Sequence, residues 1–240
     1  MGAVEELVAG NRILAHEEVI DAYGHVSVRH PDRPDRFLLA RSVSPALVVP
    51  DDILEFTLDG EPVIDEGQST YIERFIHAAV YAARPDIVSV VHAHSTPVLP
   101  YTVASVPLRA VVQDASDLGE SVVRWDIRDR FGDETNLLVS DIDKAADLVR
   151  SLGTAATVLL RGHGFVAAGA SLPLVVRSVV ALVRNAEVQT AALALGGITP
   201  LSAGEILAQR ALGSQPDSPA VRRSWEYFAY RAGCADLIAR

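Results

Sequence analysis

Three histidines have the spacing and the surroundings of metal ligands. His92 and His94 follow the apolar run of residues 87–91, whose β-branched composition predicts a buried strand. Residues i and i+2 of a strand point to the same face, so these two imidazoles can converge on one divalent ion. His163 lies in a glycine-flanked turn at residues 161–164, between two apolar runs of strand length. Three neutral histidines that leave coordination positions open are typical of a catalytic metal site, whereas His92 and His94 alone would also fit a solvated strand end.

The elements that must position these histidines form one predicted α/β unit. Apolar residues at helical spacing alternate with short β-branched runs, and glycine or proline lies at many of the junctions. Helices are predicted at residues 4–19, 73–83, 141–152 and from 173 onward, with another after 116–117 and a last one that contains Trp225, Tyr227 and Tyr230. Strands are predicted at residues 26–28, 37–40, 87–91, 157–160 and 165–168, with a hairpin formed by residues 53–58 and 62–64.

Composition limits the functions that the chain can have. The 240 residues are 49% hydrophobic and 22% charged, which is ordinary for a globular protein with one substantial core. The net charge of −10, without any basic cluster, argues against a nucleic-acid partner. No apolar stretch reaches the roughly 18 to 20 residues needed to cross a bilayer, and the start of the chain does not resemble a secretory signal. We therefore expect no membrane partner and a cytoplasmic location.

Two residue types that occur only once narrow the chemistry further. Cys234 is the only cysteine, so the chain can form neither an internal disulfide nor a cysteine-based metal cluster. Lys144 is the only lysine, and it lies at the polar start of a predicted helix, where we expect it to be exposed. Schiff-base catalysis needs a desolvated lysine of lowered pKa. A class I aldolase or a pyridoxal enzyme is therefore not expected.

The sequence resembles the class II aldolase/adducin family along most of its length. The resemblance rests on residues 24–29 (GHVSVR), on Glu73 four residues before His77, and on residues 84–86 (RPD), 90–94 (VVHAH) and 161–164 (RGHG). It implies an α/β fold, a three-layer α/β/α sandwich around a mostly antiparallel central sheet. We expect a single domain over residues 1–240, with a C-terminal helical extension from about residue 214.

The same resemblance implies a metal site and an assembly. His92, His94 and His163 match the family's metal ligands, and Glu73 matches its catalytic acid/base. Each subunit would hold one divalent metal ion, with Mn2+ or Zn2+ favoured and Co2+ or Fe2+ as alternatives. The family is usually a homotetramer with its sites at subunit interfaces, so a homo-oligomer is expected.

The residues around the predicted pocket depart from those of the family's sugar-phosphate aldolases. Those enzymes hold phosphate with a Gly-Asn pair, a Thr-Gly turn and a Ser-Ser pair, where this chain has Gly24-His25, Ser44-Pro45 and Tyr71-Ile72. Proline lacks an N–H and isoleucine has no side-chain donor, so the phosphate cradle is expected to be lost.

The replacement residues resemble the family branch that decarboxylates hydroxylated aromatic acids. His25, Arg41 and Ser44 are candidates for binding a carboxylate, and Tyr71 is a candidate for packing against a flat ring. The structural alternatives are that His25 caps a turn, Arg41 is an exposed strand end and Tyr71 belongs to the core.

The function predicted from the sequence is that of a metal-dependent carbon–carbon lyase. We expect decarboxylation of an ortho-hydroxylated aromatic carboxylic acid, similar to a dihydroxyphthalate or a hydroxypyridine dicarboxylate, with hydroxyl and carboxylate chelating the metal. Glu73 is the first candidate for protonating the ring, and His77 is either a reserve donor or a structural histidine. Three alternatives stay open: a class II aldolase acting on a sugar phosphate or hydroxy acid, a three-histidine iron oxygenase, and a non-catalytic adducin-like scaffold.

Overall fold

A mixed sheet forms the centre of the molecule in the computed structural model, which describes residues 2–213 and 215–238. Within those residues the sheet has seven strands in the order β3-β2-β1-β4-β7-β6-β5. Neighbouring strands pair antiparallel, except for the parallel pair β5–β6. This arrangement confirms the predicted α/β class and the mostly antiparallel sheet. The strands are β1 (His25–Arg29), β2 (Arg36–Ala40), β3 (Ile53–Thr57), β4 (Ser89–Ala93), β5 (Val123–Trp125), β6 (Thr157–Leu160) and β7 (Gly164–Gly169).

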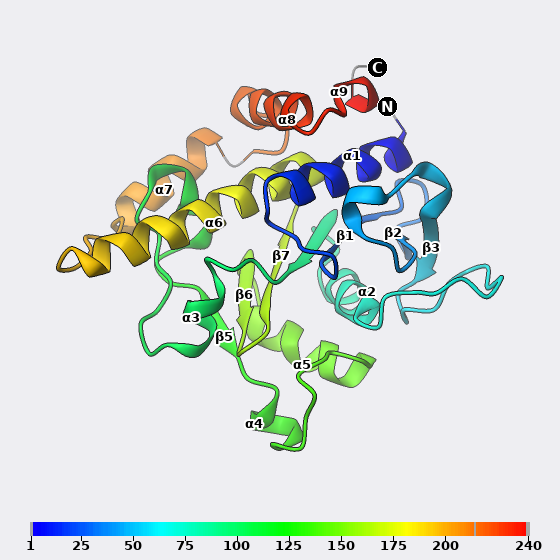
Figure 1. Ribbon diagram of the computed structural model, residues 1–240, viewed down its shortest axis with the longest axis horizontal. Coiled ribbons are helices and arrows are strands. Elements are labelled where there is room, and N and C mark those ends of the chain that lie inside the picture. The colour runs from blue at the N-terminus through cyan, green and yellow to red at the C-terminus, as the bar shows by residue number, and fades with distance from the viewer. Residues whose placement is uncertain (1, 214, 239–240) are drawn as a thin grey trace.

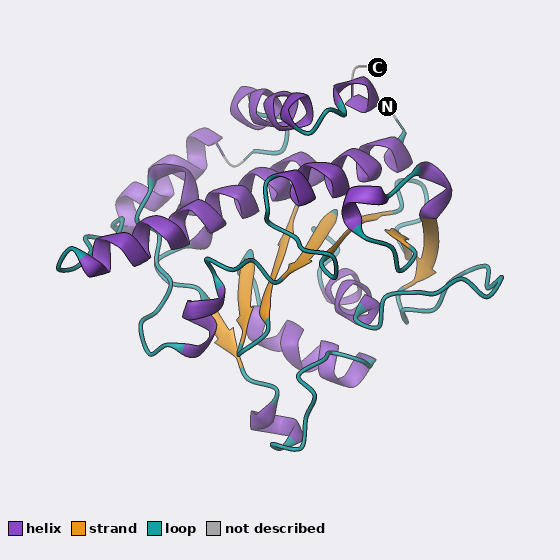
Figure 2. Ribbon diagram, in the orientation of Figure 1, coloured by secondary structure: helices purple, strands orange, loops and turns teal. Residues whose placement is uncertain are grey.

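Helices cover both faces of this sheet and complete the three layers (Figures 1 and 2). The long helix α6 (Leu172–Ala194) packs with α1 (Ala3–His16) on one face, while α2 (Arg74–Ala83) and α5 (Ile142–Leu152) pack together on the other. The predicted polar start of α5 is confirmed, because the side chain of Asp141 caps it. The side chain of Ser171 caps α6, and this cap was not predicted. The remaining helices are α3 (Leu99–Val103), α4 (Arg128–Phe131), α7 (Ala203–Gly213), α8 (Pro219–Arg231) and α9 (Ala235–Ile238), with 3-10 turns η1 (Pro45–Leu47), η2 (Pro50–Asp52) and η3 (Gln113–Leu118).

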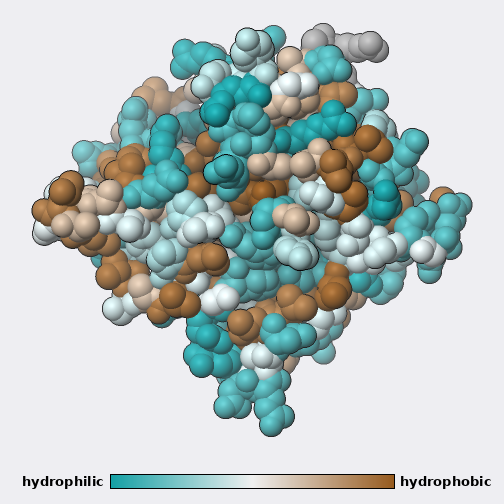
Figure 3. Space-filling view, in the orientation of Figure 1, coloured by the Kyte–Doolittle hydropathy of each residue, from teal (hydrophilic) through white to brown (hydrophobic). Residues whose placement is uncertain are grey.

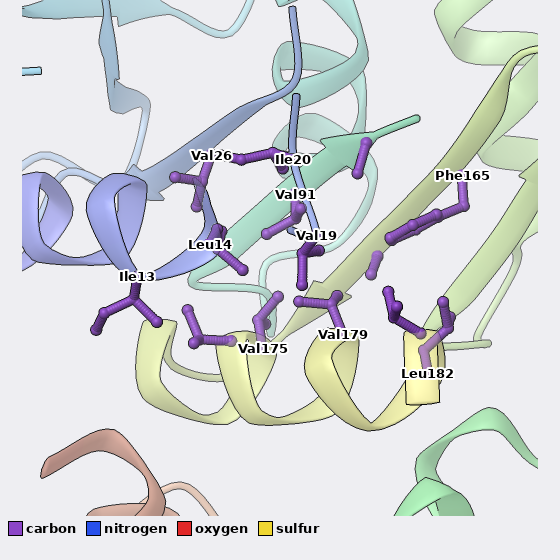
Figure 4. Close-up of a cluster of buried hydrophobic side chains, with 14 of the residues drawn as sticks. Ile13, Leu14, Val19, Ile20, Val26, Val91, Phe165, Val175, Val179 and Leu182 are labelled. Atoms are coloured by element: carbon purple, nitrogen blue, oxygen red, sulfur yellow. The ribbon is translucent and has the colours of Figure 1, made fainter. Parts of the chain in front are cut away.

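Alternation along the central strands decides which side chains face which helical layer. Val91 of β4 and Phe165 of β7 belong to the cluster beneath α1 and α6, which Figure 4 shows in close-up. Val90 and Val166, one position away, belong to the cluster beneath α2 and α5. His92 therefore points to the α2 side of the sheet. The pleat thus places His92 of β4 against α2, the helix that follows Glu73.

Two of the predicted elements differ from the structure. The helix expected after residues 116–117 is wrong: the 3-10 turn η3 ends at Gly119, where φ is +73°, and β5 follows. Arg210 of α7 donates to the carbonyl oxygens of Ser116 and Asp117 at 3.1 and 3.0 Å, and the Ser116 carbonyl also accepts the backbone N–H of Gly119 at 3.1 Å. The second strand of the predicted hairpin is reduced to a single bridge between Phe56 and Pro62.

The C-terminal helices pack onto the outer layer. Trp225 and Ala229 of α8, together with Cys234, are buried in the same cluster as α1 and α6. The predicted last helix is confirmed as α8, whereas α7 was not predicted. Ser214, where the extension was expected to start, lies outside the described residues. The prediction of one domain with this extension stays a prediction, and these contacts support it.

The surface is mixed in character. Figure 3 shows apolar side chains at the tip of the molecule where α6 ends, and Leu195, which directly follows α6, is 90% exposed. Over the described part of the chain, none of the helices combines the length and the apolar character needed to span a membrane.

Candidate metal centre and adjoining cavity

His92 is held by its neighbours on both sides in the sheet. It lies opposite His25 of β1 and opposite Val166 of β7, and it is fully buried. Its Nδ1 lies 3.0 Å from the carbonyl oxygen of Phe165. A carbonyl oxygen can only accept, so Nδ1 carries the hydrogen and Nε2 presents its lone pair. The backbone of β7 thus fixes the tautomer of His92.

His94 is oriented in the same way by a carboxylate. Its Nδ1 lies 3.1 Å from Oδ1 of Asp21, which also accepts the backbone N–H groups of Tyr23 and Gly24 at 2.9 and 2.8 Å. Burial, followed by the proximity of His92, lowers the pKa of His94 to about 4, although Asp21 opposes this shift. The imidazole is therefore neutral above that range, with its Nε2 lone pair available. A carboxylate behind a histidine is a common outer partner of metal-binding imidazoles.

His163 depends on two glycines in its turn. Gly162 has φ +65°, a left-handed conformation that favours glycine. A Cβ added to Gly164 would lie 2.1 Å from the carbonyl oxygen of Ala93, so only glycine allows β7 to approach the end of β4 this closely. Beside the turn, Nε of Arg161 lies 2.8 Å from the carboxylate of Asp126. These features bring His163 next to His94.

Glu73 completes the cluster from the start of α2. Its Oε1 accepts the backbone N–H of Val139 at 2.9 Å, and its Oε2 lies 3.3 Å from Nε2 of His92 and 3.4 Å from Nε2 of His163. Burial alone would raise the pKa of the Glu73 carboxyl, but the adjacent imidazoles of His92 and His163 outweigh burial and hold this pKa well below its usual value. Glu73 is therefore an anion in this arrangement.

The four side chains fit one metal ion. One ligand atom from each of Glu73, His92, His94 and His163 lies within 4.8 Å of all the others. Nε2 of His94 is 3.1 Å from Nε2 of both His92 and His163. Metal–nitrogen bonds of about 2.0–2.1 Å in a tetrahedral site separate neighbouring nitrogens by roughly 3.4 Å. Because His92 and His94 carry their hydrogens on Nδ1, their Nε2 lone pairs face each other and repel unless a cation lies between them. The nitrogen and carboxylate donor set is one that Zn2+, Mn2+, Co2+ and Fe2+ all accept.

A cavity of about 630 Å³ opens beside this cluster. Of the predicted substrate contacts, His25, Ser44 and Tyr71 line it, together with Glu73, His94 and His163. Among the described residues that line the cavity, none is a lysine or an arginine. The single lysine, Lys144, lies at the start of α5 and hydrogen-bonds Ser140 instead.

Arg41 and Tyr71 use their polar groups within the protein. Nε of Arg41 pairs with Oδ1 of Asp52 at 2.7 Å, and Arg41 is not among the lining residues, so its contact with a substrate stays a prediction. The hydroxyl of Tyr71 donates to the carbonyl of Val43, and burial raises the pKa of Tyr71 to about 12. The ring of Tyr71 lies 4.5 Å from that of His25 between centroids. Tyr71 therefore offers the cavity a ring face rather than a hydroxyl.

His77 occupies the position of a structural histidine. It is fully buried, and both ring nitrogens are hydrogen-bonded, Nε2 to His25 at 2.7 Å and Nδ1 to Ser27 at 2.6 Å. Burial lowers the pKa of His77 to about 3. His77 is not a lining residue of the cavity, so a direct proton transfer from it to a bound molecule lacks a path.

Several groups that orient the cluster were not found from the sequence. Asp21, Asp126 and the backbone N–H of Val139 each contact a site residue or its turn from far away along the chain. Nothing in the sequence around Asp126 indicated its role. Asp21, which precedes the GHVSVR motif by only three residues, carried no signal of its own.

Comparison with known proteins places the chain in a family. The Class II Aldolase and Adducin N-terminal domain matches residues 5–190. The chain belongs to the class II aldolase and adducin family. The decarboxylase tropJ of Talaromyces stipitatus is 39% identical over 204 residues, covering 80% of this chain and 77% of that protein. The 3,4-dihydroxyphthalate decarboxylase of Arthrobacter keyseri is 30% identical over 181 residues, covering 71% of each.

Solved structures of the class II aldolase family agree with the fold. An aldolase II superfamily protein from Pseudomonas syringae superposes with a TM-score of 0.81 at 22% identity, covering 98% of this chain and 93% of that one. This likeness confirms the class II aldolase fold. The decarboxylase relatives show that the family includes enzymes that remove carboxyl groups.

We expect the three histidines to be needed individually for metal binding. His92→Ala, His94→Ala and His163→Ala should each fold but lose the ion, because the remaining ligands cannot close the coordination sphere. Elemental analysis of purified protein, with circular dichroism to check folding, measures this. Stoichiometric metal in any one of these variants would remove that histidine from the site.

We also expect Gly164→Ala to disrupt the site without touching a ligand. The new methyl group would collide with the backbone of Ala93 and push β7 from β4, lowering both the melting temperature and the metal content. Gly204→Ala is the matched control, because its added Cβ meets only Ser202 Oγ, at 3.9 Å. Equal metal content and melting temperature in the two variants would contradict the close approach.

Proposed function

We propose that this chain is a divalent-metal-dependent decarboxylase of an ortho-hydroxylated aromatic carboxylic acid, similar to a dihydroxyphthalate or a hydroxypyridine dicarboxylate. The observation that carries the proposal is the cluster of His92, His94, His163 and Glu73 at one wall of a cavity that also presents an aromatic face. Two relatives whose names specify decarboxylation support the same reaction class.

The cavity suits a flat, acidic ring better than a flexible sugar. The side chains of Tyr71 and Ile72 supply apolar surface, and His25 lines the same cavity. A bound divalent ion would supply Lewis-acid stabilisation of the negative charge that develops when the carboxylate leaves. His92, His94 and His163 would hold that ion through their Nε2 atoms. None of the described lining residues is a lysine or an arginine, so no such side chain would compete with the ion for the carboxylate of the bound acid.

Glu73 has the position and charge state to carry the proton. Its carboxylate lines the cavity, so it is placed to accept the hydroxyl proton of the entering acid, which leaves a phenolate. When the bond between ring and carboxylate breaks, carbon dioxide departs and the electron pair stays on the ring carbon. That carbon then takes the proton back from Glu73, which regenerates the carboxylate. The hydrogen bond from Val139 holds Glu73 in place through both transfers.

A class II aldolase acting on a sugar phosphate is the second candidate, and one observation favours it. Ser42, Ser44, Ser69 and Thr70 all line the cavity, so hydroxyl donors remain where the sequence predicted a lost phosphate cradle. A phosphate dianion would nevertheless find no lysine or arginine among these lining residues. The aromatic acid remains the better match.

The assembly is also a proposal. We propose a homo-oligomer, a tetramer by family resemblance. The exposed side chains of Leu195, Leu207 and Leu212 support it, because large apolar side chains on a surface can be covered by another chain.

Glu73→Gln separates binding from chemistry. The amide keeps an acceptor for Val139 but cannot exchange a proton, so we expect substrate affinity within about tenfold of wild type and turnover lower by a factor on the order of 10² to 10⁴. Glu226→Gln, at an exposed position on α8, is the control. Nearly unchanged turnover in Glu73→Gln would assign the proton to another group, such as one from an adjacent subunit.

A competition experiment separates the two candidate substrates. Metal-loaded protein should bind 2-hydroxybenzoate and its more substituted relatives, and benzoate should bind more weakly because it lacks the hydroxyl. Calorimetry against a ketose phosphate, with carbon dioxide release and oxygen consumption followed in parallel, measures the preference. Tight binding of the ketose phosphate alone would favour the aldolase, and oxygen-dependent turnover would favour an oxygenase.

A further inference from the structure

A chain of buried polar groups runs from the cavity into the space between β1 and α2. Nδ1 of His25 lies 2.7 Å from Nε2 of His77, and Nδ1 of His77 lies 2.6 Å from Oγ of Ser27. The Ser27 hydroxyl lies 2.8 Å from the hydroxyl of Tyr81. None of the four residues is more than 2% exposed. The proposed proton transfer through Glu73 does not use this chain.

The far end of the chain fixes its direction. The Tyr81 hydroxyl has two acceptors, Oγ of Ser27 at 2.8 Å and the carbonyl oxygen of Val88 at 3.4 Å. The Val88 carbonyl could accept a second hydrogen bond, but 3.4 Å is longer than the usual distance of about 2.5–3.0 Å between a hydroxyl and its acceptor. Donation to Val88 would therefore leave a buried phenol hydrogen poorly satisfied, which is costly. Tyr81 donates to Ser27.

The direction of each further hydrogen bond in the series follows from this first donor. Ser27 accepts from Tyr81, so its own hydrogen goes to Nδ1 of His77. A neutral imidazole has one donor and one acceptor nitrogen, so His77 carries its hydrogen on Nε2 and donates to Nδ1 of His25. The hydrogen of His25 then resides on Nε2, the ring nitrogen not engaged by His77.

We propose that His25 presents a fixed Nε2–H donor to the cavity, and that His77, Ser27 and Tyr81 are positioning residues that set this tautomer. The group recognised would be an anionic oxygen, either the carboxylate or the phenolate of the bound acid. The identity of that ligand rests on the proposed function, whereas the tautomer does not. The described residues that line the cavity include no lysine or arginine. The neutral Nε2–H of His25 would therefore favour ligands that place a hydrogen-bond acceptor at this position.

The tautomer can be read directly by nitrogen NMR. Protein labelled with ¹⁵N-histidine and loaded with zinc, a diamagnetic ion, should give a protonated-type shift for Nε2 of His25 and an acceptor-type shift for Nδ1. The His25→Gln variant assigns these signals by their loss. Protonation of Nδ1 in the wild type would overturn the proposal, whatever activity the protein has.

Substitution at Ser27 tests the positioning role. Ser27→Ala removes the donor to His77, so the Nε2-protonated population should fall and binding of 2-hydroxybenzoate should weaken roughly tenfold. Ser27→Thr keeps a hydroxyl and should restore both. Ser89→Ala is the matched control, because Ser89 is equally buried and donates to the backbone carbonyl of Ser27 outside the chain.

The outcomes separate this inference from the proposed function. A changed tautomer in Ser27→Ala with unchanged affinity for 2-hydroxybenzoate would overturn the donor role of His25. A protonated Nε2 in a protein that binds 2-hydroxybenzoate but releases no carbon dioxide would support the inference while rejecting the decarboxylase.

Discussion

Two nitrogen lone pairs that face each other at 3.1 Å are the constraint on which the site depends. His92 and His94 cannot relieve the repulsion by sharing a hydrogen, because the carbonyl of Phe165 and the carboxylate of Asp21 hold their hydrogens on the opposite nitrogens. A buried arrangement of this kind is stable around a cation and costly without one. The outer partners therefore specify the chemistry of the centre as strongly as the ligands do.

The pleat of the sheet and the start of α2 satisfy this constraint together. Alternation along β4 directs His92 away from the core beneath α1 and α6, toward the layer in which Glu73 begins a helix. The same alternation on β1 places His25 and Ser27 on that face. The layer beneath α1 and α6 is therefore an apolar core, while the layer beneath α2 and α5 combines an apolar core with the polar residues of the candidate site.

The sequence predicted those parts of the molecule whose signals are local. Strand-length runs, the cap Asp141 and the glycine-flanked turn at His163 each depend on residues close together in the chain, and the α/β class follows from them. The three-layer sandwich was implied by the family resemblance. Contacts between distant residues carried no such signal. The pairing of Arg41 with Asp52, the bond from Tyr71 to Val43 and the role of Asp21 depend on how loops meet in space. The helix wrongly predicted after residue 117 lies in the same class, because the contact of Arg210 with the carbonyls of Ser116 and Asp117 joins residues more than 90 positions apart.

The sequence separation of the ligands has a consequence for the order of folding. His94 and His163 are 69 residues apart, and the bond that fixes the tautomer of His92 spans 73 residues. Contacts over such distances form slowly, because a long loop must close before they stabilise anything. During synthesis the ribosome must deliver β7 before β4 gains its second neighbour. An ion that needs both His94 and His163 would therefore bind a nearly finished sheet and stabilise the native state, rather than guide the early steps of folding.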